Sequence, residues 1–370
     1  MERVGFISQS GWYRRSDKSL VPSNRNKGFF VFFGNNIHIL EEREMKATKK
    51  ILALVLAVAL IFTLVSCTDN TDMIKIGVIQ YAPHPSLDNC YTGFIEGLAE
   101  GGYEVGKNIE IDFQNAMGEM SNSDLIASTM VSSKYDMILG IATPSAMSAY
   151  GAAKNTDIPV IFSAVSDAVA AGIVQSNEKP GYNVTGTSDV LPLEAQMQMI
   201  RAFLPEATKI GIIYTTSEPN SVTHLAQFKE LAKQYNFTIV EVGVTNASEV
   251  AAAVTTVISK GVDCINNFTD NNVVNNLSTL IHAADAANIP VFGSEVEQVK
   301  NGCIASESID YVELGRETGR MAAKILDGEK ASEMPVALIS ASEPVYNKKV
   351  AQRLNINLPD AYADAEDVGE

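Results

Sequence analysis

The sequence predicts an α/β protein built from two similar lobes, each a doubly wound parallel sheet. Short β-branched runs alternate with amphipathic helical patterns from about residue 74 onward, which is typical of parallel sheets covered by helices. The series of strands and helices that begins at Ile74 begins again at Lys209. About 300 residues follow the N-terminal leader, too many for one typical core and enough for two lobes.

The first series holds four strand-like runs, each followed by a turn. They cover residues 74–79, 109–113, 137–141 and 159–162. Helical patterns over 88–100, 123–133 and 144–155 separate them, and Gly101-Gly102 ends the first helix.

The second series repeats this order. Its strand-like runs cover residues 209–214, 237–242, 262–265 and 290–292. Two halves with the same order of strands imply a crevice between the lobes, facing the carboxyl ends of both sheets.

An apolar run before these series is typical of an export signal. Residues 51–65 follow Lys49 and Lys50, lead into Ser66-Cys67, and are shorter than the roughly 20 residues of a membrane-spanning helix. An uncleaved anchor or a buried core helix are the alternatives, but a core helix would not normally have lysines bunched at one end. Cys67 lies where substrates of lipoprotein signal peptidase carry their cysteine. We therefore expect a mature protein that begins at Cys67 and is lipid-anchored to the outer face of the cell membrane.

The signal begins unusually far into the chain. We interpret residues 1–44 as sequence upstream of the true start, Met45, or as a disordered leader. Residues 41–44 can all be encoded by purine-only codons, as a ribosome-binding site read in frame would be. Residues 45–66 are then the signal peptide and 67–73 a tether.

The mature part is strongly acidic. Residues 1–66 hold ten of the 28 Lys and Arg and five of the 44 Asp and Glu, which leaves 18 basic and 39 acidic residues, a formal charge of −21. This charge argues against nucleic acid as a partner and favours a soluble domain beside the membrane.

Three cysteines remain beyond Cys67, namely Cys90, Cys264 and Cys303. Their spacing matches no common zinc motif, so we expect neither a metal site nor a cofactor. We interpret all three as packed thiols and leave open a disulfide between Cys264 and Cys303.

Polar loops directly follow the predicted strands. They are residues 80–85, 143–145, 163–167, 215–220, 268–272 and 294–295. Ligands of open α/β sheets bind at the carboxyl ends of strands, so the six loops predict one site. Each loop taken alone could simply cap its own helix. Thr143-Pro144-Ser145 places a hydroxyl and a proline at a helix start, where free backbone N–H groups would suit a carboxylate.

Catalytic motifs are missing from the sequence. There is no Gly-x-Ser-x-Gly, no His-Glu-x-x-His and no phosphate-binding glycine loop. His224 and His282 fall in predicted helices, whereas His84 lies in a Pro-His-Pro loop at the rim of the site, where it either packs or faces the ligand. Nothing places Asp167 and Asp270 at the separation of a glycosidase pair. We do not expect an enzyme.

Several motifs together resemble a known family. They are residues 140–145, 158–167, 183–188, 309–311 and 313–316. In this order they resemble the ABC transporter substrate-binding proteins of the tryptophan/tyrosine-binding type, over about residues 75–358. The resemblance implies a periplasmic-binding-protein type I fold, in which two lobes joined by three crossing segments close on a small ligand. The chain departs from the family pattern at Ala168 and at residues 266–268. The second departure lies beside the expected site and bears on ligand identity.

We expect the N-terminal lobe to comprise residues 74–188 plus 304–330. The C-terminal lobe would comprise 189–303 plus 331–360, and residues 361–370 would form a disordered tail.

The resemblance implies an amino acid, aromatic or other, as the ligand, and an ABC permease with its ATPase as partners. We expect Thr143, Ser145 and Ser163 to hold the ligand carboxylate. Glu218, Asn220 and Asp270 would meet its ammonium group after the hinge closes, because a buried charge needs a partner. Tyr81, Tyr214 and Phe268 are candidates for an aromatic wall. The full predicted set of ligand-binding residues is Gln80, Tyr81, His84, Thr143, Pro144, Ser145, Ser163, Ala164, Asp167, Thr187, Tyr214, Ser217, Glu218, Asn220, Phe268, Asp270, Asn271, Ser294 and Glu295.

Two alternatives remain at this point. A sugar-binding or nucleoside-binding lipoprotein of the same fold would be expected to show more aromatic residues than the 7% found here. A ligand sensor that feeds a membrane kinase would have the same sequence features, because this fold serves both roles.

Replacing Cys67 tests the anchor. A Cys67→Ala variant should leave ligand binding intact and move the protein from the membrane fraction to the soluble fraction, since it removes the only acylation site. Fractionation followed by immunoblotting measures this. Continued firm membrane association would show that the lipid-anchor interpretation is wrong.

Overall fold

The computed structural model describes residues 73–369. The predicted leader, the signal peptide, Cys67 and the rest of the tether before Met73 lie outside these residues. Within the described part of the chain, no helix combines the length and the apolar character needed to cross a membrane.

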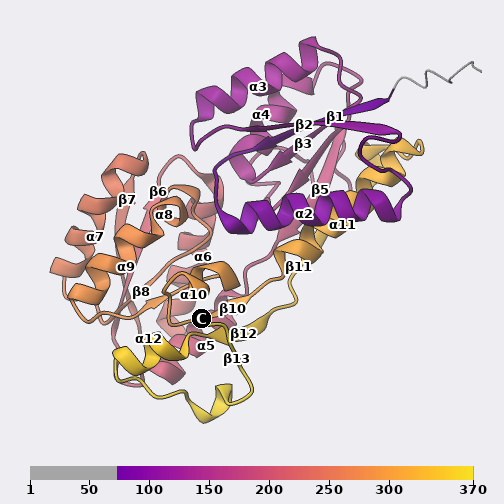
Figure 1. The fold of residues 1–370 in the computed structure, drawn as a ribbon. Coiled ribbons are helices and arrows are strands. Elements are labelled where there is room, and N and C mark those ends of the chain that lie inside the picture. The colour runs from indigo at the N-terminus through magenta and orange to yellow at the C-terminus, as the bar shows by residue number, and fades with distance from the viewer. Residues whose placement is uncertain (1–72, 370) are drawn as a thin grey trace, which may run out of the picture. The chain divides into compact units, whose positions relative to one another are not determined.

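The first lobe is built on a six-stranded parallel sheet (Figure 1). Its strand order is β11-β5-β4-β3-β1-β2. The bounds are β1 (Ile74–Gln80), β2 (Ile109–Asn115), β3 (Met137–Ile141), β4 (Val160–Ser163), β5 (Val184–Asp189) and β11 (Ala337–Ile339). Every residue of β3, β4 and β5 is buried, because helices cover both faces of the sheet.

Two pairs of helices cover this sheet. The pair α3 (Met120–Ser132) and α4 (Thr143–Ala153) lies on one face, and α2 (Pro85–Glu100) and α11 (Tyr311–Leu326) lie on the other (Figure 1). Alternate residues of one strand enter the two cores, as the pleat requires: Ile161 belongs to the α2 side, and Val160 and Phe162 belong to the α4 side.

The second lobe has a four-stranded parallel sheet of order β7-β6-β8-β9. Its strands are β6 (Lys209–Thr215), β7 (Thr238–Val244), β8 (Cys264–Asn266) and β9 (Val291–Phe292). Its helices are α5 (Leu193–Phe203), α6 (Pro219–Gln234), the short η1 (Ala247–Glu249), α7 (Val250–Ser259), α8 (Asn271–Asn275), α9 (Leu277–Ala286) and α10 (Val296–Lys300). The first four strands of each lobe pair in the same order, which confirms the predicted doubly wound lobes.

A small third sheet packs against the second lobe. It has the order β10-β12-β13, with β10 (Ala305–Ser308), β12 (Glu343–Tyr346) and β13 (Glu366–Asp367). The remaining elements are η2 (Ala331–Glu333), α12 (Lys348–Arg353) and η3 (Asp360–Tyr362). The chain crosses between the lobes after β5, between β10 and α11, and between β11 and β12.

Two of the expected domain boundaries need correction. Residues 331–360 were assigned to the C-terminal lobe, but Ala337–Ile339 pairs with Thr187–Asp189 at the edge of the N-terminal sheet. Residues 304–330 were assigned to the N-terminal lobe, yet β10 pairs with β12 and only α11 joins the first lobe. Strands of three or four residues show no period that could assign them to a sheet, and their partners are far away in sequence.

The expectation of a disordered tail is wrong up to residue 369. Glu366 and Asp367 pair with Val345 and Tyr346 of β12, and the Tyr362 ring lies 5.8 Å from that of Phe203. An acidic composition predicts disorder. Here one aromatic contact and two residue pairs between β13 and β12 hold the tail in place.

The structure agrees with the interpretation of the three cysteines as packed thiols. Cys90, Cys264 and Cys303 are free and buried, so the alternative of a Cys264–Cys303 disulfide is wrong.

Helices α2 and α11 meet at the distance of backbone contact. An added Cβ at Gly93 would lie 1.9 Å from the Val312 carbonyl oxygen, and one at Gly315 would lie 2.1 Å from that of Cys90. Gly97 and Gly319 are equally confined, one turn further along each helix. Residues four apart share one face of a helix, so each helix presents a glycine groove to its partner.

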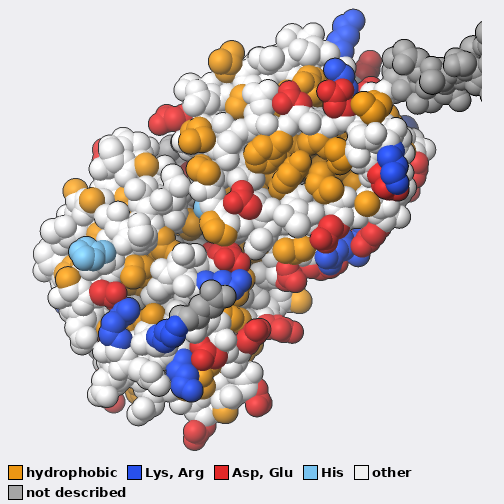
Figure 2. Space-filling model, in the orientation of Figure 1, with side chains coloured by type: hydrophobic (Ala, Val, Ile, Leu, Met, Phe, Trp, Pro, Cys, Tyr) orange, Lys and Arg blue, Asp and Glu red, His pale blue; other side chains and the backbone are white. Residues whose placement is uncertain are grey.

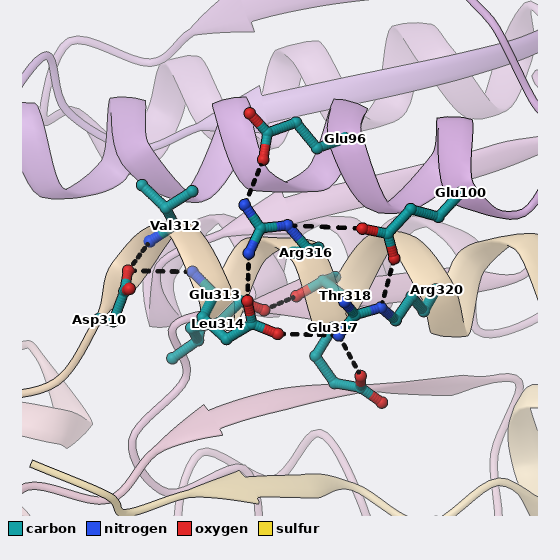
Figure 3. Close-up of polar contacts among 10 residues, drawn as sticks. All are labelled: Glu96, Glu100, Asp310, Val312, Glu313, Leu314, Arg316, Glu317, Thr318 and Arg320. Atoms are coloured by element: carbon teal, nitrogen blue, oxygen red, sulfur yellow. Dashed lines mark hydrogen bonds and ion pairs between the residues drawn. The ribbon is translucent and has the colours of Figure 1, made fainter.

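Ion pairs cover the outer side of this contact (Figure 3). Arg316 of α11 contacts Glu96 and Glu100 of α2, at 2.5 Å and 3.6 Å. Arg320 contacts Glu100 at 2.6 Å and Glu313 at 2.8 Å. The pairs are partly exposed, so they align the helices while the glycines set the distance.

Alanine substitution tests the close approach. Gly93→Ala should lower the free energy of unfolding by about 2 kcal/mol or more, because the two helix backbones must separate to admit the methyl group. Gly151→Ala is the matched control, because Gly151 is an exposed helical glycine with open space around it. This substitution should raise the free energy of unfolding by about 0.5 to 1 kcal/mol. Urea denaturation measures both. Equal effects of the two substitutions would contradict the tight contact.

Candidate functional site

A cavity lies between the two lobes, with about 350 Å³ not filled by protein atoms, part of it open to solvent. The N-terminal lobe contributes His84, Ser86, Leu87, Ala142, Thr143, Ala164, Ser166, Asp189 and Tyr311 to its lining. The C-terminal lobe contributes Asn220, Thr269, Asn271, Val274, Glu295 and Gln298. The cavity therefore forms where the carboxyl ends of both sheets face each other, as the sequence predicts.

Long helices begin at this cavity from both lobes. Ser86 is in the first turn of α2, Thr143 opens α4, Tyr311 opens α11, and Asn220 is in the first turn of α6. Helix starts carry N–H groups without intrahelical partners and a positive partial charge. The cavity thus offers donors from the backbone, although its side chains are rich in acceptors.

The backbone is unusual at two lining residues. Ala142 and Ala164 have φ angles of 74° and 56°, in the region that favours glycine. Both follow buried strands, and the Ala142 N–H donates to the Ser163 carbonyl at 3.0 Å. Strained backbone of this kind concentrates at functional sites, and here it sets the turn that leads into α4.

Two buried carboxylates line the cavity. Asp189, at the end of β5, accepts hydrogen bonds from the Ser166 hydroxyl at 3.0 Å and the Tyr311 hydroxyl at 2.8 Å. Glu295 caps α10 by accepting from the backbone N–H groups of Glu297 and Gln298. Burial raises the pKa of Asp189 to about 6 and that of Glu295 to about 7.

Neither carboxylate has a lysine or arginine partner within residues 73–369. A buried negative charge without a counter-ion is costly, so the cavity favours a ligand with a cationic group.

Four other lining side chains carry a buried polar atom without a hydrogen-bond partner in the described part of the chain. These atoms are His84 Nδ1, Ser86 Oγ, Asn220 Oδ1 and Thr269 Oγ1. Each such atom costs about 1 to 3 kcal/mol if it stays unsatisfied, and a polar ligand would remove that cost.

Six residues of the predicted set line the cavity. They are His84, Thr143, Ala164, Asn220, Asn271 and Glu295. They come from all six polar loops that follow strands, one residue from each, and from both lobes.

Asp270, predicted to meet an ammonium group, does not line the cavity. It caps α8 through the Val273 N–H at 3.0 Å and accepts from the Thr215 N–H, the Thr215 hydroxyl and the Ser221 hydroxyl at 2.5 to 2.8 Å. All four donors belong to its own lobe. Glu218 lies behind Asn271, whose Nδ2 donates to Glu218 Oε2 at 2.7 Å.

The predicted hydroxyl groups lie beneath the cavity wall. Ser163 and Thr187 both contact the Thr318 hydroxyl of α11, at 3.0 Å and 2.7 Å. Ser145 accepts from Ser123 at 3.2 Å, and Pro144 is buried beside it. Ser163 and Thr187 thus fix α11 to the sheet, and Ser145 links α4 to α3.

The predicted aromatic wall is not formed by the three rings expected. The Tyr81 hydroxyl donates to the Gly118 carbonyl at 2.8 Å, and Phe268 packs against Phe228 at 5.3 Å between ring centroids. Tyr214 lies half-buried on β6. Tyr311 is instead the aromatic ring that lines the cavity.

The remaining predicted residues have local roles. Gln80 donates to Asp88 and to the Ala82 carbonyl, Asp167 accepts from the Ala170 N–H, Ser294 donates to the Asn267 carbonyl, and Ser217 is exposed. None of them lines the cavity.

Sequence reasoning missed nine lining residues. They are Ser86, Leu87, Ala142, Ser166, Asp189, Thr269, Val274, Gln298 and Tyr311. A signal existed for Asp189, because it ends a buried strand whose last residues are polar, which is the pattern used for the other loops. Ala142, Ser166 and Tyr311 lie in motifs that carry the family resemblance.

Comparison with known proteins decides the family. The family model described as ABC transporter substrate binding protein matches residues 75–367. This chain belongs to that family. The family consists of binding proteins, which agrees with the expectation that the chain is not an enzyme, and its members act outside the cytoplasm.

A curated relative and a solved structure are similar over most of the chain. A "Tyrosine-binding protein" of Clostridioides difficile (strain R20291) is 39% identical over 84% of this chain and 94% of its own length. An ABC domain from Streptococcus pneumonia, solved in complex with L-Trp, has a TM-score of 0.77 at 36% identity, covering 80% of this chain and 98% of its own.

A second solved structure is also similar over most of the chain. A ligand-free, open substrate-binding protein with adhesive properties from Clostridium difficile has a TM-score of 0.61 at 39% identity, again over 80% of this chain and 99% of its own. The TM-score is lower than that of the L-Trp complex, although the identity is higher. The contact of His84 Nε2 with Asn271 Oδ1 and the hydrogen bond from Asn89 Nδ2 to Glu297 Oε1, both at 3.4 Å, join the two lobes.

The role of Asp270 as a cap can be tested. Asp270→Asn should lower the free energy of unfolding by about 3 kcal/mol, because an amide cannot accept from four buried donors. Asp167→Asn, which affects one half-exposed backbone contact, is the control and should cost less than about 1 kcal/mol. Chemical denaturation distinguishes them, and a small effect at Asp270 would contradict its structural role.

Proposed function

We propose that this protein is an extracytoplasmic, lipid-anchored receptor that captures an amino acid between its lobes and delivers it to an ABC importer. The observation that carries the proposal is Asp189, a buried carboxylate without a cationic partner among residues 73–369, in a cavity that the two lobes share. An α-ammonium group is the partner that this carboxylate needs.

The carboxylate of an amino acid would find its binding place at the start of α4. Helix α4 begins at Thr143 in the cavity lining and has no acidic residue in its first turn. Its free backbone N–H groups and positive end suit a carboxylate. A ligand ammonium on Asp189 and a ligand carboxylate on α4 would both rest on the N-terminal lobe.

The names of the relatives support an aromatic amino acid. One is called tyrosine-binding and another was solved with L-Trp. The departure of residues 266–268 from the family pattern lies close to the site, because Asn267 Nδ2 donates to Gln298 Oε1 at 2.9 Å and Gln298 lines the cavity. This contact could distinguish the ligand of this chain from those of its relatives.

The alternatives find less support. Solved sugar-binding proteins match this chain with TM-scores of 0.55 to 0.57 and identities of 12 to 17%. Similarity at this level supports a shared fold and says nothing about a shared ligand. A ligand sensor would share the same cavity. A permease and an ATPase among the gene neighbours would favour uptake, and a histidine kinase would favour sensing.

The anchor completes the proposal. Cys67 lies outside the described residues, and β1 begins at Ile74, so a tether of residues 68–73 would connect the lipid to the first lobe. Such a tether would keep the receptor beside its permease.

Calorimetric titration of the mature domain with amino acids tests the function. We expect tyrosine or tryptophan to bind and Asp189→Asn to weaken that binding at least about 30-fold, as loss of one partner of a buried charge pair does. The pKa of Asp189 is about 6 and a bound ammonium would lower it, so wild-type affinity should fall as pH drops below 6. Binding of a sugar or nucleoside with no response to any amino acid would overturn the proposal.

A further inference from the structure

We propose that the Nδ1 atom of His84 accepts a hydrogen bond from the ligand side chain, so that the site selects amino acids whose side chain carries an O–H or N–H donor. Tyrosine and tryptophan meet this requirement and phenylalanine does not. The inference rests on the proposed function and adds a rule of specificity to it.

The argument begins at Glu218, which is buried behind the cavity wall. Its Oε2 atom accepts from the Asn271 main-chain N–H at 3.2 Å. A main-chain N–H can only donate, so Oε2 is an acceptor even when the carboxyl group is protonated on its other oxygen.

The orientation of the Asn271 amide follows from this. Asn271 Nδ2 lies 2.7 Å from Glu218 Oε2 and must be the donor to it. The Asn271 Oδ1 atom therefore faces His84, 3.4 Å from His84 Nε2. Two acceptors would repel each other there, so the hydrogen of His84 resides on Nε2.

The state of the second ring nitrogen is then determined. Burial lowers the pKa of His84 to about 4, so the ring is neutral at pH 7 and carries one hydrogen. Nδ1 is a bare acceptor. It is buried, has no partner among residues 73–369, and belongs to a residue that lines the cavity.

A second acceptor is fixed in the same way. Asn220 Nδ2 donates to the Thr269 carbonyl at 3.2 Å and to Glu218 Oε2 at 3.4 Å, which leaves Asn220 Oδ1 as an unpaired acceptor in the lining. Glu218 thus positions both acceptors, one directly and one through Asn271.

Counting donors indicates what the ligand must supply. An α-ammonium group has three N–H donors. The cavity presents the carboxylates of Asp189 and Glu295 together with His84 Nδ1 and Asn220 Oδ1. An ammonium that pairs with both carboxylates has one N–H left for His84 Nδ1 and Asn220 Oδ1, so a donor on the ligand side chain would satisfy the other of these two acceptors. An unmet buried acceptor costs about 1 to 3 kcal/mol, which corresponds to about 5-fold to 150-fold in affinity.

Two substitutions at His84 separate the acceptor from the link to Asn271. Glutamine places its amide nitrogen where Nε2 lies and has no atom at the Nδ1 position. Asparagine places its amide group at the Nδ1 position and does not reach Asn271. We expect wild type to bind tyrosine at least about 10-fold more tightly than phenylalanine. His84→Gln should bring this ratio close to one, and His84→Asn should retain most of it.

Titration calorimetry with tyrosine, tryptophan and phenylalanine measures the ratios, and a purely structural role of His84 would weaken all three ligands equally. A ratio unchanged by His84→Gln overturns the inference. Equal affinity of wild type for tyrosine and phenylalanine also overturns it while leaving the proposed function intact, whereas absence of any amino-acid binding overturns the function itself. Nitrogen-15 NMR of the wild-type histidines tests the tautomer without any variant, and a hydrogen on Nδ1 would contradict the inference.

Discussion

The contact between α2 and α11 at backbone distance is the constraint on which the cavity depends. Both helices begin at the cavity, where α2 presents Ser86 and Leu87 and α11 presents Tyr311. Thr318 of α11 contacts Ser163 and Thr187, which fixes the pair to strands β4 and β5. The chain enters α11 from a crossing between the lobes, so this helix pair connects the crossing segment to the cavity lining (Figure 1).

The polar contacts that join the two lobes around the cavity are weak. Two polar contacts of 3.4 Å join them around the cavity, both longer than the usual 2.7 to 3.2 Å of a protein hydrogen bond. A zwitterion that rests on the first lobe and meets acceptors of the second would contribute stronger interactions across the gap. Figure 2 shows charged side chains of both signs on the visible face of both lobes, in several places side by side, with an apolar area on the N-terminal lobe.

Periodicity and loop chemistry were sufficient to predict the fold and the general position of the site. The strands at 74–79 and 209–214 are long and regular, and the polar loops after them mark the sheet edge where the cavity lies. Prediction failed where the same residue type has two roles. Asp270 and Asp189 both follow strands, but Asp270 is surrounded by donors of its own lobe while Asp189 faces the cavity. Only the three-dimensional neighbours distinguish a cap from a ligand contact. The edge strand β11 was missed for a related reason, because its partner β5 lies about 150 residues earlier in the sequence.

The burial of the three thiols affects how the protein reacts with oxidants outside the cytoplasm. Cys90, Cys264 and Cys303 are fully buried, and burial raises the pKa of each thiol above its ordinary value. The thiolate is the form that reacts with oxidants and disulfides, so these side chains are chemically inert while the domain stays folded. The receptor can therefore carry free thiols in an oxidising compartment without forming mixed disulfides or covalent dimers. Unfolding would expose them, so the same three residues would make any misfolded copy prone to irreversible cross-linking.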